Sequence, residues 1–104
     1  MLIADTADWV GRAFCLVGPN RPEFRNGSRG AYVVFCCRAH DMGDAFNSVC
    51  KELLENDLHI RGFDYFFDIN YMDREISEYE RMLQLRLEDY PVQFTNVHFF
   101  APDG

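Results

Sequence analysis

The sequence contains no run of apolar residues that approaches the ~20 needed to span a membrane. Its N-terminal stretch, MLIADTADWV, lacks the Lys or Arg of a secretory signal peptide and carries Asp5 and Asp8 instead. Both absences argue against membrane-spanning and secreted classes. We therefore expect a cytoplasmic protein with no membrane partner.

The four cysteines lack the spacings that bind metals or form disulfide frameworks. No Cys-x-x-Cys pair is present, and no histidine pair stands near a cysteine in the sequence. The cysteines sit among apolar residues, which is typical of reduced thiols in a core. We expect neither a metal site nor a cofactor. The four residues are Cys15, Cys36, Cys37 and Cys50.

A complete catalytic motif is also missing. His40, His59 and His98 stand alone, and no Walker or dinucleotide-binding fingerprint is present. A cysteine nucleophile acting with His98 would need an electropositive, partly exposed setting, which the apolar stretches around the cysteines do not indicate. We therefore predict a binding protein and not an enzyme.

What the sequence does contain is enough apolar surface for one core. Its 104 residues are 48% hydrophobic and include ten Phe and five Tyr. A chain of this length is near the usual size of a single domain, and such a composition offsets the entropy of ordering the chain. We predict one domain over residues 1–104.

The negative charge is confined to the second half of the chain. The formal net charge is -7, and residues 1–52 are neutral because their acidic and basic side chains balance. From Leu53 onward, acidic residues far outnumber the four arginines. Such a surface repels phosphate backbones, so we expect no direct binding of nucleic acid. It attracts cationic proteins and accelerates their association.

Hydrophobic periodicity predicts an α/β (α+β) fold. Asp41 is placed to cap the first helix, and Ser77 or Asp73 the second, with the Ser77-x-x-Glu80 spacing of a capping box. We predict a two-layer sandwich of about four strands, in the order β-β-α-β-α-β, with two helices packed on one face. A split ferredoxin-like ordering is the rival topology. The predicted strands are 12–17, 31–39, 60–71 and 92–101, and the predicted helices begin near 42 and 77.

A long loop rich in Arg, Gly and Pro is predicted at residues 18–30. Arg21, Arg25 and Arg29 recur in it at intervals of four. Arginines and glycines together can cradle a phosphate, yet the same residues also suit a solvated connection whose charges balance the acidic half. Because long loops in small domains are often functional, these arginines are candidate ligand contacts.

Residues 60–71, IRGFDYFFDINY, alternate between two faces of a strand. The alternation places Asp64, Phe66, Asp68 and Asn70 on the wetter face. An aromatic ring surrounded by carboxylates is typical of a protein-binding anchor, and this makes Phe66 a candidate. The alternative is that the segment around Trp9 covers this face. Asp64 and Asp68, about 13 Å apart along a strand, cannot chelate one ion between them.

These observations favour a small inhibitor of the immunity or antitoxin kind, whose carboxylates mimic phosphates and dock on a basic protein such as a toxin nuclease. The alternative is a homodimeric ferredoxin-like module that binds a small anionic ligand at the dimer seam. A monomer would favour the first hypothesis and a dimer the second. The predicted partner-binding residues are Asp64, Phe66, Asp68, Asn70, Asp73, Glu75 and Glu78.

Overall fold

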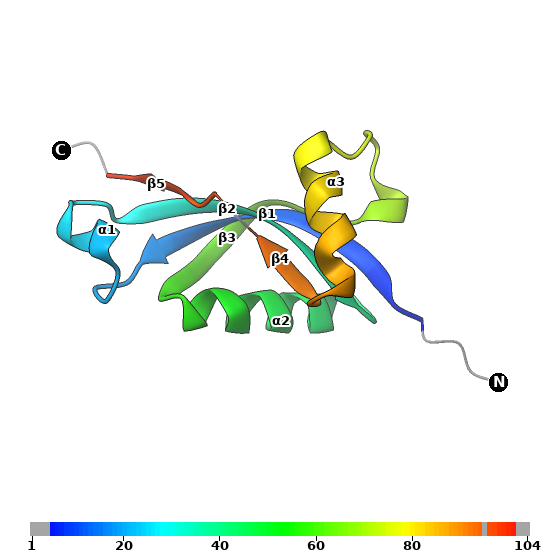
Figure 1. Cartoon of the computed structure of the whole chain (residues 1–104), viewed down its shortest axis with the longest axis horizontal. Coiled ribbons are helices and arrows are strands. Elements are labelled where there is room, and N and C mark those ends of the chain that lie inside the picture. Colours follow the sequence, from blue (N-terminus) through cyan, green and yellow to red (C-terminus); the bar gives the residue numbers. More distant parts are fainter. Residues whose placement is uncertain (1–4, 95, 102–104) are drawn as a thin grey trace.

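The computed structural model describes residues 5–94 and 96–101, which form an antiparallel sheet of five strands with three α-helices (Figure 1). The general α+β sandwich is confirmed. A fifth strand arises because the predicted strand at 92–101 is two short strands, and a third helix lies in the predicted loop at 18–30. In chain order the elements are β1 (Ala7–Val17), α1 (Pro22–Arg25), β2 (Gly30–Ala39), α2 (Met42–Glu55), β3 (Leu58–Asp68), the 3-10 turn η1 (Ile69–Tyr71), α3 (Glu78–Leu85), the 3-10 turn η2 (Arg86–Glu88), β4 (Val92–Phe94) and β5 (His98–Phe100).

The strand order is β3-β1-β2-β4, and β5 also pairs with β2. Every pairing is antiparallel, so β2 and β3 run in the same direction with β1 between them. Helix α2 connects β2 to β3 across β1, which is a split β-α-β unit. The two long strands next to each other, β1 and β2, therefore form the centre of the sheet.

Helices α2 and α3 lie on opposite faces of this sheet, so the prediction that the two helices pack on one face is wrong (Figure 1). Helix α2 buries Val49 and Leu53 against the odd-numbered positions of β1 and β2. Helix α3 buries Leu83 against Val10 and Cys36, which are even-numbered and point the other way. The prediction assumed parallel crossovers, whereas antiparallel β4 lets the chain return on the second face.

Both predicted helix starts are confirmed. Asp41 caps α2, where its Oδ1 accepts a hydrogen bond from the backbone N–H of Asp44 at 2.8 Å. Ser77, and not Asp73, caps α3 through a capping box. In that box the Ser77 hydroxyl accepts from the N–H of Glu80 at 3.1 Å, and Glu80 Oε1 accepts from the N–H of Ser77 at 2.9 Å.

Two register shifts interrupt β3 where it pairs with β1. The partner of Arg12 is Tyr65 and the partner of Ala13 is Phe63, so Asp64 is an extra residue in the ladder; Arg61 is extra in the same way. Each extra residue shifts the alternation by one position. As a result Phe63 and Phe66, three residues apart, both pack on the side of α2.

Candidate functional site

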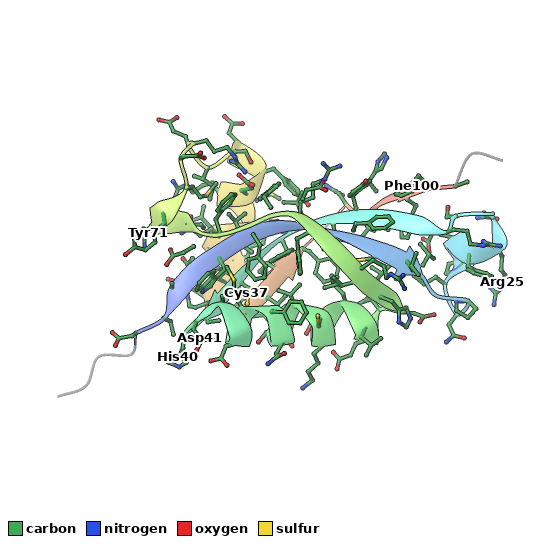
Figure 2. All side chains as sticks on the ribbon, turned by 180° about the vertical axis from the view of Figure 1, so that it is seen from behind. Arg25, Cys37, His40, Asp41, Tyr71 and Phe100 are labelled. Atoms are coloured by element: carbon green, nitrogen blue, oxygen red, sulfur yellow. The ribbon has the colours of Figure 1, made fainter. Side chains whose placement is uncertain are left out.

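The molecule is elongated, with principal extents of 55, 26 and 21 Å. Figure 2 shows Tyr71 and Arg25 at opposite ends of it. Between Asp64 and Glu80 the sequence has six carboxylates and one basic residue, Arg74. We refer to four exposed residues of this segment as the acidic end: Tyr71, Asp73, Glu75 and Glu78.

Glu80 is the buried member of this segment and accepts hydrogen bonds from three residues. Arg74 donates from Nη1 and Nη2 at 2.9 and 2.8 Å, the Tyr65 hydroxyl donates at 2.9 Å, and the Ser77 N–H donates at 2.9 Å. The side chain of Glu80 is only 3% exposed. Both terminal nitrogens of Arg74 are therefore bound by Glu80, and Arg74 forms no ion pair with the exposed carboxylates of this segment.

The hydrogen bonds from Arg74 lower the pKa of Glu80 from 4.5 to about 2, against the opposing effect of burial. A folded-state pKa below the unfolded value stabilises the protein above about pH 4.5, and this stabilisation is lost as the pH falls through about 2. We expect the free energy of unfolding, measured in urea, to fall between these pH values. The fall should be clearly shallower in Glu80→Gln, and an equal fall in both proteins would contradict this assignment.

The three carboxylates of the acidic end differ from Glu80 because they face solvent. Asp73, Glu75 and Glu78 are exposed, and within residues 5–94 and 96–101 their carboxylates accept no hydrogen bond and form no ion pair. Tyr71 is 82% exposed, more than any other large hydrophobic side chain described. Tyr71 lies at one end of the molecule (Figure 2), and the three free carboxylates follow it within seven residues of the chain.

Three other predicted residues serve the fold within the described part of the chain. Asp64 forms an ion pair with Arg12 at 2.9 Å. Asp68 caps η1, its Oδ1 accepting from the N–H of Asn70 at 2.9 Å. Asn70 also lines a polar hollow of about 320 Å³ beside Asp8.

The prediction that Phe66 shares an exposed face with Asp64 and Asp68 is wrong. Its ring is partly buried and makes edge-to-face contacts with Trp9, at 6.0 Å between centroids, and Phe35, at 5.5 Å. Of the alternative, that the segment around Trp9 covers this face, the structure shows the contact between Trp9 and Phe66, whereas Asp64 and Asn70 are exposed. The register shift at Asp64 is the physical cause, because it turns Phe66 toward α2.

The arginines of the predicted loop are held differently from one another. Arg21 donates to Glu23 at 2.9 Å and to the carbonyl of Asn56 at 2.7 Å. Arg29 donates to the carbonyl of Phe24 at 2.8 Å, and its guanidinium lies 3.7 Å from the centre of the Phe24 ring. Arg25 is exposed at the end of α1. The fold therefore engages two of the three guanidinium groups.

Sequence reasoning missed a polar cluster where α3 meets β1 and β2. Asp8 accepts from Arg38 Nε at 2.8 Å and from Gln84 Nε2 at 2.9 Å. Burial raises the pKa of Asp8, but the hydrogen bonds from Arg38 and Gln84 outweigh it, so the pKa lies below its usual range. Asp8 and Arg38 are opposite each other in the β1–β2 register, which the linear sequence does not reveal.

The thiols lie in settings that suppress reactivity. Cys15, Cys36 and Cys37 are buried, while Cys50 is partly buried. Burial raises the pKa of Cys36 to about 12 and that of Cys37 to about 11, so very little thiolate forms at neutral pH.

Among the described residues, no group of three or more His, Cys, Asp and Glu side chains is arranged to hold a metal ion. Nor does any described helix have the length and apolar character needed to cross a membrane.

Comparison of the chain with known proteins found no matching family model, no matching curated protein and no matching solved structure. The geometry of the acidic end is therefore the basis for a functional proposal.

Proposed function

We propose that the protein is a small acidic inhibitor that binds a basic protein through the acidic end. The observation that supports this proposal is the set of three exposed carboxylates, Asp73, Glu75 and Glu78, whose neighbouring arginine is already bound by Glu80. Free carboxylates need no internal ion pair to be broken before they meet a partner's arginines and lysines. In the proposed complex these carboxylates bind the arginines and lysines of a basic nuclease or toxin site, which would otherwise hold the phosphates of a nucleic acid.

Tyr71 supplies the apolar part of this surface. Binding energy in protein interfaces concentrates in a few aromatic and arginine side chains that are exposed before binding and buried afterwards. At 82% exposure Tyr71 has most of its surface available for burial by a partner. It takes the role that the sequence had indicated for Phe66.

The alternative function is a homodimeric ferredoxin-like module that binds a small anionic ligand at the dimer seam, and the arginine loop that would close over this ligand offers it less geometric support. Arg21 donates hydrogen bonds to Glu23 and to a backbone carbonyl, and Arg29 donates to backbone carbonyls. Each guanidinium also lies over an aromatic ring. Of these three arginines, all within the described residues, only Arg25 is exposed without such contacts. A single free guanidinium on a four-residue helix offers little charge for a dedicated anion site.

The test compares two charge-reversed variants that change the net charge equally. The first replaces Asp73, Glu75 and Glu78 with lysine, and the control replaces the exposed Asp44, Glu55 and Asp89. The wild-type chain is used to capture its partner from the source cells, and calorimetry then measures the affinity of each variant for that partner. We expect the first variant to bind about 100-fold more weakly and the control to change much less, because long-range attraction alone is weaker than direct contact.

Either of two results would contradict the proposal. Equal weakening by the two variants would show that only the overall charge matters. A captured partner that is acidic would remove the charge complementarity on which the proposal depends.

A further inference from the structure

A second apolar surface lies at the other end of the sheet, on the face that α3 covers only in part. Phe14, Leu16 and Tyr32 occupy even-numbered positions there, and the ring of Phe100 from β5 joins them. Figure 1 shows α3 over the opposite end of this face and no helix above the stretch beside β5. We call these four residues the aromatic face.

The aromatic face is preformed. The rings of Phe14, Tyr32 and Phe100 contact one another with centroids 5.4 to 5.9 Å apart. Gly30 makes this arrangement possible, because a Cβ at that position would clash with the Phe100 ring. Leu16 remains 39% exposed beside a shallow hollow of about 260 Å³. Little conformational entropy is left to lose when such a surface is covered.

Charge determines which partner this surface fits. The chain has a net charge of -7, so two copies repel each other over most of their surfaces. The aromatic face is an exception. Beside it Arg12 and Asp64 neutralise each other at 2.9 Å, and Arg12 lies 4.2 Å from the centre of the Tyr32 ring. The nearby loop adds arginines and few carboxylates.

We propose that two copies of the chain associate through the aromatic face in a two-fold symmetric dimer. A symmetric interface must be complementary to itself, and an apolar surface meets that condition because it needs no opposite charge on its partner. Arg29, which lines the hollow, donates to the backbone carbonyls of Phe24 and Ser28 and adds a positive charge at the rim of an otherwise acidic protein. This arrangement rests on different residues from the proposed function and leaves both acidic ends open, so a dimer formed here is compatible with the inhibitor, and the charge-reversed variants, not the mass in solution, then separate the two functional hypotheses.

The test is the mass of the protein in solution, measured by sedimentation velocity over a wide range of concentrations. We expect wild-type protein to reach twice the chain mass of 12.2 kDa. Leu16→Glu should weaken association roughly 100-fold, because it places a charge in the centre of the interface. Leu85→Glu is the matched control, since Leu85 is 71% exposed on α3, and it should dimerise like the wild type.

Salt separates this dimer from a head-to-tail assembly of basic end on acidic end. Added NaCl screens repulsion between two negative copies, so the proposed dimer should keep or gain affinity, while a head-to-tail contact should weaken. Circular dichroism and the unfolding midpoint confirm that Leu16→Glu still folds, and Leu16→Thr replaces it if it does not. A monomeric wild type, loss of association in high salt, or association unaffected by the Leu16 variants would overturn the proposal.

Discussion

Replacing Glu80 with alanine is expected to lower the free energy of unfolding by about 3 kcal/mol, the lower end of the range for breaking a buried ion pair. The substitution leaves the Tyr65 hydroxyl and the Ser77 N–H without their acceptor and destroys the capping box of α3. The loss is not larger because Arg74 is 43% exposed and can turn toward water. Urea unfolding at pH 7 measures the change.

Glu78→Ala is the control for this prediction. Glu78 lies two residues earlier in the same helix turn and is exposed, so its removal should cost about 0.5 kcal/mol or less. A loss below about 1 kcal/mol for Glu80→Ala would mean that water replaces the carboxylate without penalty. The order and size of the two effects therefore test whether Glu80 organises the acidic end.

Replacing Phe35 with alanine is expected to destabilise the fold by about 3 to 5 kcal/mol, the usual cost of removing a buried Phe side chain. Phe35 is fully buried in the central strand β2 and makes edge-to-face contacts with Phe63 and Phe66. Its ring lies against Gly11, where a Cβ would clash with it. We expect the neighbouring side chains to fill the resulting cavity only in part. Urea or thermal unfolding measures this loss.

The matched control is Phe46→Ala. Phe46 contacts Phe63 from α2, but it is 41% exposed, so its truncation removes less buried surface and leaves no closed cavity. We expect a loss of about 1 kcal/mol or less. Similar losses for the two variants would show that the core relaxes around Phe35 and that the aromatic cluster is less tightly packed than its contacts indicate.

Features set by local sequence were predictable here. The apolar spacing of α2 and its cap at Asp41 involve residues close together in the chain, and so does the capping box at Ser77. The split of the last predicted strand and the short helix α1 were missed. The split of the last strand depends on β2, which pairs with β4 along one stretch and with β5 along another.

The errors at the candidate site have one physical origin, which is pairing between distant segments. The strand 60–71 was assigned by strict alternation, yet its register with β1 places Asp64 outside the ladder and turns Phe66 inward. The ion pair between Arg12 and Asp64 joins residues that no sequence window contains together. Asp73, Glu75 and Glu78 were predicted from the excess of acidic residues in the second half of the chain, and all three are exposed, the last as the first residue of α3. Tyr71 was not singled out because it had been placed on the packed side of that strand.

The two register shifts in β3 have a consequence for how the protein behaves when it is crowded. β3 ends the sheet on one side, and a long, regular edge strand is a template onto which other chains add, as in fibrils. Here Arg61 and Asp64 interrupt the edge with charged, exposed residues and twist it out of a straight line. A strand with the aromatic-rich sequence FDYFFD can therefore form the edge of the sheet without serving as a template for the addition of other chains.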